Sequence, residues 1–167
     1  NHHAIWTPRR FTVRSSSKPD EETPAVEMNE NIEHITLLEN SGQIVIQHTN
    51  GFAVYPWISG QTTLPQPSLR MEGIQLLRAF SNGDLLYRKP PAKDGQFEVW
   101  IHQQKSDLLL GRFKGQVRQI LRNQDDVLAI RVKREVHGFQ AGKPLGKVWV
   151  ADESGVALSN RGHSLAV

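Results

Sequence analysis

The sequence predicts an all-β protein built from a repeated unit of short strands. Three observations predict this class. Three segments read as strand–turn–strand hairpins, a β-branched residue followed by an aromatic one comes after each of them, and helical periodicity is poor throughout. The chain has 167 residues, of which 38% are hydrophobic and 22% are charged. This composition is typical of a globular protein with room for a core.

The three predicted hairpins share two apolar runs around a polar turn, and they cover residues 35–47, 74–88 and 117–131. Gly42 and Gly83 supply the left-handed conformation that such turns need in the first two copies. In the third copy we expect Asn123 and Asp125 to adopt this conformation without glycine. Equivalent turn positions lie 41 and 42 residues apart, which indicates an internal repeat.

A second marker predicts the strand that follows each hairpin. It is the β-branched–aromatic pair, found at Ile5-Trp6, Val54-Tyr55, Val99-Trp100 and Val148-Trp149. A further strand-like run then follows, at residues 10–14, 106–113 and 155–158. One unit is therefore four short strands in about 41 to 49 residues, which is the size of a propeller blade. We expect a β-propeller-like array of four-stranded blades.

Three segments of the second copy resemble a known repeat. Leu77–Tyr87, Phe97–Ile101 and Leu109–Phe113 resemble the turn, the aromatic strand and the last strand of a TolB-type, WD40-like β-propeller repeat. Residues 5–12 are similar to the last two parts of the same repeat. Asn82 stands where that family usually has a proline–aspartate pair. The resemblance implies a propeller and does not imply one function.

The two ends of the chain leave two arrangements open. Residues 1–14 could be the last two strands of a blade and residues 156–167 the first two, which would close about four blades into a ring. Alternatively, residues 155–158 are the last strand of the third copy and the chain is part of a larger propeller. In both cases we expect one domain over residues 1–167, with residues 15–31 as a polar linker or long loop.

Catalytic, metal and cofactor sites are not predicted. The chain has no cysteine, its seven histidines lack metal-ligand spacing, and it contains no nucleophile elbow, phosphate loop or dinucleotide fingerprint. The cluster of Arg9, Arg10 and Arg14 reads as solvated surface, so we expect no contact with nucleic acid. No apolar run reaches 18 residues, so no membrane span is expected within the chain.

The connection between the second and third strand of each copy grows along the chain, from residues 48–51 to 89–96 and then 133–147. Loops on a rigid scaffold commonly carry binding sites. The residues that we expect to contact a partner are Lys89, Lys93, Lys133, Arg134, Phe139, Lys143 and Lys147. Their charge predicts a protein partner with an acidic surface. The alternative is that these lysines only keep the surface soluble and block strand pairing at sheet edges.

The expected function is a non-catalytic recognition module, the sensory or protein-interaction domain of a larger bacterial protein. The TolB-type resemblance implies a membrane-anchored transcription regulator, with this domain in the periplasm or otherwise outside the cytoplasm and the tether elsewhere in the protein. Two alternatives are the propeller domain of a peptidase or other hydrolase whose catalytic domain lies elsewhere, and a stand-alone periplasmic assembly factor.

Overall fold

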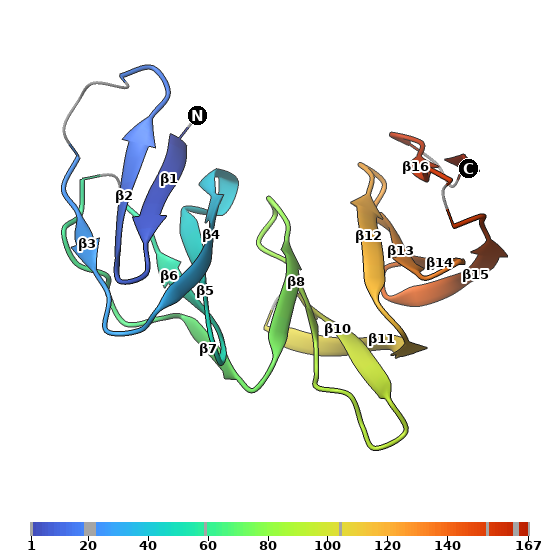
Figure 1. The fold of residues 1–167 in the computed structure, drawn as a ribbon. Helices are drawn as coiled ribbons and strands as arrows, with labels where there is room; N and C mark the ends of the chain where they lie inside the picture. Colours follow the sequence, from blue (N-terminus) through green and yellow to red (C-terminus); the bar gives the residue numbers. More distant parts are fainter. Residues whose placement is uncertain are drawn as a thin grey trace. The chain divides into compact units, whose positions relative to one another are not determined.

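The computed structural model describes residues 2–18, 23–58, 60–103, 105–152, 154–161 and 164–166. In these ranges the regular elements are β-strands, apart from one 3-10 turn, η1 (Glu39–Ser41) (Figure 1). The all-β fold class is therefore confirmed. The chain divides into two compact units, which we call unit 1 (residues 1–88 and 102–105) and unit 2 (residues 89–101 and 106–167).

Unit 1 contains a three-stranded and a four-stranded antiparallel sheet. The first has the order β1 (His2–Thr7), β2 (Arg10–Ser15), β3 (Val26–Glu27), and the second has the order β4 (Ile32–Leu38), β5 (Gln43–His48), β6 (Gly51–Pro56), β7 (Leu69–Glu72). Both sheets contribute to one core, formed by Phe11, Val13, Val26, Ile32, Ile35, Ile44, Ile46, Ala53 and Tyr55. Each sheet thus buries a face against its neighbour, as stacked layers of strands must.

Strand β3 corrects the expected linker. Val26 pairs with Phe11 of β2 and is 1% exposed, so this short strand lies inside the stretch 15–31 that the sequence predicts to be a polar loop. The burial of one apolar side chain beside Phe11 is enough to add an edge strand to an otherwise polar segment. Residues 19–22 of the same stretch lie outside the described residues.

The next four strands belong to one sheet with the order β11-β10-β9-β8. They are β8 (Gln75–Ala79), β9 (Leu85–Arg88), β10 (Gln96–Gln103) and β11 (Ser106–Lys114). Burial alternates along β10, where Phe97, Val99 and Ile101 are buried and their neighbours are not. This period of two is what a strand with one apolar face requires.

Unit 2 also contains a complete four-stranded sheet and a small two-stranded one. The four strands follow each other in space as in sequence, in the order β12 (Val117–Arg122), β13 (Val127–Val132), β14 (Glu135–Gln140), β15 (Lys143–Trp149). The short strands β16 (Ala157–Leu158) and β17 (Leu165–Ala166) pair with each other. Ala129, Val136, Val150 and Val156 form a buried cluster, against which Leu121 and Leu165 pack.

The three predicted hairpins are confirmed as β4–β5, β8–β9 and β12–β13. Gly42 and Gly83 have φ of 60° and 92°, as the turns require. In the third turn the left-handed residue is Asp126, with φ 64°, and not Asn123 or Asp125. Asn123 acts differently. Its Oδ1 accepts hydrogen bonds from the backbone N–H of Asp125 (3.1 Å) and of Val127 (2.9 Å). The Asn123 side chain thus stabilises the turn by bonding to its backbone.

The segment 133–147 is not the long loop that the sequence predicts. It contains β14 and most of β15, joined by two-residue turns. Glycine, lysine and proline make this stretch look like a loop, yet Val136 and Phe139 are buried at 2% and 3% exposure. In consequence Val148-Trp149 lies on the fourth strand of its sheet, whereas Val54-Tyr55 lies on the third strand, β6.

The C-terminal segment forms the start of a new pair of strands. Because β15 already completes the preceding sheet, residues 155–158 are not its last strand, which corrects one of the two expected arrangements. Strands β16 and β17 instead pair as a hairpin within residues 156–167, as the other arrangement expects. Residues 162 and 163, which come between these two strands in the sequence, lie outside the described residues. Closure of a ring through residues 1–14 stays a prediction, as do the number of blades and the single domain.

Candidate functional site

The seven residues predicted to contact a partner are all in unit 2, but only some of them share a site. Lys133 and Arg134 form the turn between β13 and β14 and line a surface hollow. Lys89 lies apart from it, with its Nζ 4.1 Å from the centre of the Trp100 ring. Two more, Lys93 and Lys143, are exposed outside the hollow, in the β9–β10 connection and at the start of β15. Phe139 is buried, so it is not available for binding as predicted.

The hollow around Lys133 and Arg134 has a volume of about 530 Å³ and is mainly cationic. We call it the basic hollow. It is lined by Arg112, Phe113, Lys114, Arg118, Val132, Lys133, Arg134, Glu135, His137, Trp149 and Asp152. Five of these side chains are cationic and two are carboxylates. The lining comes from β11, from all four strands of the β12–β15 sheet and from the segment after β15.

The turn that presents the two central cations is tight. Val132 pairs with Glu135, so only Lys133 and Arg134 connect the strands. Lys133 has φ 53°, a left-handed conformation that glycine adopts at lower cost than lysine. The stem of Lys133 lies over Gly115, where an added Cβ would be 2.4 Å from Lys133 Cε. Lys133 thus adopts a backbone conformation that disfavours lysine, and its side chain packs closely against Gly115.

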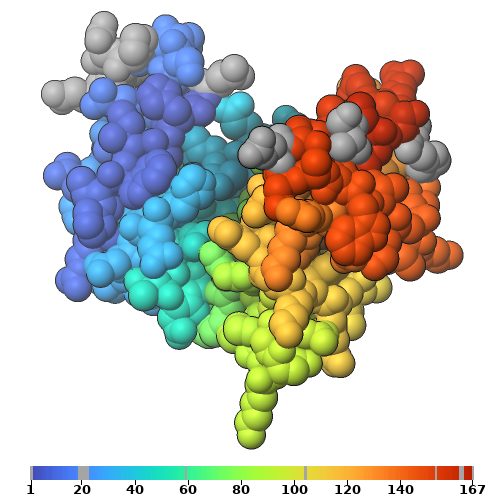
Figure 2. All heavy atoms as spheres, turned by 45° about the vertical axis from the view of Figure 1, so that its right-hand side comes forward, coloured from blue at the N-terminus to red at the C-terminus, as the bar shows by residue number. Residues whose placement is uncertain are grey.

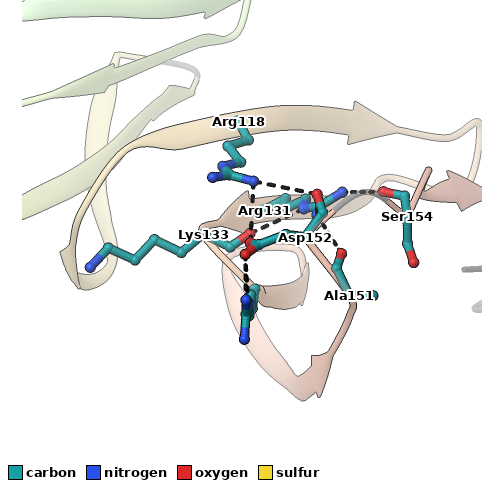
Figure 3. Close-up of polar contacts among 7 residues, drawn as sticks. Arg118, Arg131, Lys133, Ala151, Asp152 and Ser154 are labelled. Atoms are coloured by element: carbon teal, nitrogen blue, oxygen red, sulfur yellow. Dashed lines mark hydrogen bonds and ion pairs between the residues drawn. The ribbon is translucent and has the colours of Figure 1, made fainter.

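A buried arginine fixes the segment that carries Asp152 (Figure 3). The Arg131 side chain is 6% exposed, and its guanidinium donates to the carbonyl oxygens of Lys133 (3.1 Å), Ala151 (2.8 Å), Asp152 (2.8 Å) and Ser154. Four backbone acceptors thus satisfy its hydrogen bonds, and its charge also acts on the Asp152 carboxyl and contributes to the lowered pKa of that group. The arrangement ties Ala151, Asp152 and Ser154 to strand β13.

Asp152 then lies between two arginines of the hollow. Its Oδ2 accepts from Arg134 Nε at 2.8 Å and Nη2 at 2.5 Å, and its Oδ1 lies 3.4 Å from Arg118 Nη1. The hydrogen bonds from Arg134 lower the pKa of the Asp152 carboxyl, and the same contact raises the pKa of Arg134. In Figure 3 the Lys133 side chain extends away from Asp152.

The strands β14 and β15 contribute a second group of polar and aromatic side chains to the same face. Glu135 pairs with Trp149 and His137 with Lys147 across the two strands. Lys147 Nζ donates to Glu135 Oε1 at 2.7 Å, and this bond lowers the pKa of Glu135. The His137 ring lies edge-on to Phe113, with 4.9 Å between ring centres. Trp149 is 71% exposed at the rim.

The arrangement suits an anion. Asp152 pairs with both Arg134 and Arg118, which leaves a net positive charge on the three groups, and Glu98 accepts bonds of 3.0 and 3.1 Å from Arg112. Over the part of the chain that the structure describes, Lys114 and Lys133 form no ion pair. Two free ammonium groups beside three paired guanidinium groups favour carboxylate or phosphate ligands.

Sequence reasoning missed the cations that come from strands. Arg112, Lys114 and Arg118 lie on strands β11 and β12, whereas the sequence pattern points to loops as the binding elements. The available signal was the period of two in Arg112 and Lys114, which places both on one face of β11. The sequence predicts Trp149 only as part of the strand repeat. The position of Asp152 depends on the buried Arg131, which the sequence does not single out.

Among the described residues, no three His, Cys, Asp or Glu side chains come together as metal ligands. None of the described helical segments is long and apolar enough to cross a membrane.

The chain was compared with known proteins. No protein-family model matches it, and no curated protein is similar to it in sequence. Among solved structures, Hsv2 of Kluyveromyces lactis has a TM-score of 0.64 at 15% identity and covers 93% of this chain. Hsv2 of Kluyveromyces marxianus has a TM-score of 0.67 at 16% identity and covers 99% of this chain.

Both of these proteins are β-propellers, and the match includes 50% of the first and 55% of the second. The chain therefore spans about half the length of the propellers it matches. At this level of identity the comparison concerns the fold and not the activity. The TolB-type resemblance of the second copy stays a resemblance. The four-stranded antiparallel sheets of this chain are blades of a β-propeller-like fold.

Proposed function

We propose that this chain is a non-catalytic recognition module that binds an acidic surface of a protein partner in the basic hollow. The observation that carries the proposal is a hollow lined by five cationic side chains, two of which, Lys114 and Lys133, form no ion pair with any described residue. Lys133 supports it, because this left-handed position disfavours lysine and the side chain there adds positive charge to the hollow.

The aromatic rim favours a protein partner over a free small anion. Trp149 is exposed beside Arg134, and tryptophan and arginine are the residues most enriched among energetically dominant positions of protein interfaces. A flat indole adds apolar contact area around the charged centre, and this excludes water from the ion pairs.

The finer role that we propose is the sensory or protein-interaction domain of a larger bacterial protein, placed outside the cytoplasm, such as a membrane-anchored transcription regulator. The support is the TolB-type resemblance of residues 77–113. The complete gene tests it. A winged-helix domain followed by a membrane span agrees with the proposal, whereas a hydrolase domain on the same chain contradicts it.

Charge reversal in the basic hollow tests the binding directly. The probe is a fluorescein-labelled glutamate-rich peptide, and its binding is measured by fluorescence anisotropy. We expect the double variant K133E/R134E to bind at least about tenfold more weakly, equivalent to about 1.4 kcal/mol. Wild-type binding should also weaken as salt rises from 50 to 300 mM, because screening shortens the reach of exposed charges.

The matched control is K93E/K143E. It changes the net charge by the same amount, in the same unit, at two exposed lysines outside the basic hollow. Wild-type-like binding by this control shows that position and not total charge decides the affinity. Equal losses in the two double variants would contradict a site in the basic hollow.

A further inference from the structure

Strand β15 is an open edge of its sheet. It has β14 on one side, no strand of the described part of the chain pairs with its other side, and all seven of its residues are exposed (Figure 1). Three of the exposed side chains are large and apolar: Leu145, Val148 and Trp149. In the space-filling view, orange-red atoms from this part of the sequence lie at the surface of unit 2 (Figure 2).

The register identifies the backbone groups that are free on that edge. Val150 N–H donates to the Arg134 carbonyl at 2.8 Å, in the same register that pairs Val136 with Val148. In an antiparallel pair, residues that bond inward alternate with residues whose N–H and C=O point outward. Lys147 and Trp149 are thus the residues that present backbone donors and acceptors to the open side.

Two hollows flank this edge, one on each face of the sheet. The basic hollow lies on the face that carries Glu135, His137 and Trp149. A second hollow of about 580 Å³ lies on the opposite face. It is lined by Val127, Ala129, Val136, Gly138, Gln140, Leu145, Gly146, Lys147, Val148, Leu158 and Leu165. We call it the apolar hollow. Its depth comes from the paired glycines Gly138 and Gly146, which leave no side chain on the sheet.

We propose that β15 receives an extended segment of the partner as a fifth strand, and that this segment alternates acidic and apolar residues. Side chains of an added strand point to the two faces in turn, so every second one reaches the basic hollow and the others reach the apolar hollow. The acidic residues of this pattern rest on the proposed function, in which the basic hollow binds an acidic partner. The proposal adds the mode of binding and the sequence pattern of the ligand.

The start of β15 limits where the new strand can pair. Pro144 cannot donate a backbone hydrogen bond, and the register shifts between Gly138 and Phe139. Both features guard the first half of the edge against pairing. The docking segment is therefore the second half, from Gly146 to Trp149, beside both hollows.

Two peptides of identical composition test the pattern. One is a labelled ten-residue peptide of alternating glutamate and valine, and the other places its five glutamates before its five valines. We expect the alternating peptide to bind at least tenfold more tightly by fluorescence anisotropy. Equal affinities would overturn strand addition. If the two peptides bind equally well but both bind more weakly to K133E/R134E, the proposed function stands and strand addition does not.

A matched pair of variants tests the backbone. K147A removes the side-chain charge and keeps the outward N–H, whereas K147P removes both. Binding of the alternating peptide should be much weaker in K147P than in K147A, with thermal unfolding recorded for each. Equal binding by two folded variants overturns the proposal. If K147P alone abolishes binding while K133E/R134E leaves it unchanged, the edge is confirmed and the acidic specificity is wrong.

G138V tests the apolar hollow independently. A Cβ at Gly138 meets only ordinary contacts, the nearest being Leu145 Cβ at 3.6 Å, so the variant fills the hollow from the middle of β14 without backbone strain. We expect G138V to bind the alternating peptide at least fivefold more weakly than wild type and to bind an all-glutamate peptide with unchanged affinity. Equal effects on the two peptides would overturn the role of the apolar hollow. If the wild type forms a dimer without peptide and K147P dissociates it, the occupant of the edge is a second copy of this chain and the proposed partner segment is wrong.

Discussion

At the scale of single residues, Lys133 connects the fold to the proposed binding. Its backbone is left-handed, with φ 53°, and its stem covers Gly115. The sequence could predict that Lys133 and Arg134 matter, because they stand together in a polar stretch. It could not predict the strain, because the register that makes this a two-residue turn depends on the pairing of Val132 with Glu135.

Replacing Lys133 by asparagine separates stability from binding. Asparagine adopts the left-handed conformation more readily than lysine, so K133N should raise the free energy of unfolding by up to about 1 kcal/mol or leave it unchanged. The variant also loses one of the two free cations, so the acidic probe should bind more weakly. Urea unfolding and anisotropy measure the two quantities. A less stable variant with unchanged binding would contradict both parts.

The carboxylate of Asp152 makes the site sensitive to pH. Hydrogen bonds from Arg134 lower its folded pKa, and those from Lys147 lower the pKa of Glu135. A carboxyl whose pKa is lower in the folded than in the unfolded state stabilises the fold at any pH above its ordinary pKa, which is 3.8 for Asp152. This stabilisation is lost as the pH falls from the ordinary pKa through the lowered one. The unfolding temperature of the wild type should therefore begin to decrease near about pH 5 and keep decreasing as the pH falls through and below the ordinary pKa values of these two carboxyls.

The variant D152N should show a shallower fall over this range, measured by thermal unfolding at each pH. At pH 7 it should also bind the acidic probe more tightly, because Arg134 and Arg118 lose their internal carboxylate. An unchanged pH profile would show that the Asp152 contacts contribute nothing to folding.

At the scale of elements, turn chemistry was the reliable signal. The hairpins β4–β5 and β8–β9 follow from Gly42 and Gly83, and the third follows from an Asn/Asp turn even though the left-handed residue is Asp126. Strand β14 was missed because it has only two large apolar residues, Val136 and Phe139, and because its flanking turns contain Lys133 and Gly142. Its buried residues become visible only once the neighbouring strand β13 is in place, since all six residues of β13 are buried.

Phe139 tests the corrected assignment of β14. The side chain is 3% exposed and its residue pairs with Leu128 of β13, so F139A should lower the free energy of unfolding by about 3–5 kcal/mol in a urea titration. L145A is the matched control, since Leu145 is 50% exposed and should change stability by about 0.5 kcal/mol at most. Similar small effects in both variants would contradict strand β14 and favour an exposed loop at Phe139.

At the scale of the whole molecule, the repeat predicts the class of fold, and similarity to two propellers of which the chain spans about half agrees with it. The site was less predictable, because the basic hollow combines β11, the β12–β15 sheet and Asp152, which are brought together only by folding. Composition indicates that the chain is basic. It does not indicate which cations remain free after the internal ion pairs have formed.

A titration of the ¹⁵N-labelled chain with the glutamate-rich peptide, followed by amide chemical shifts, tests the central claim most directly. Binding in the basic hollow predicts shift changes concentrated in residues 112–118, 132–137 and 147–152, and their loss in K133E/R134E. Changes confined to unit 1 or to the β9–β10 connection at residues 89–95, or no changes at saturating peptide, would contradict the account.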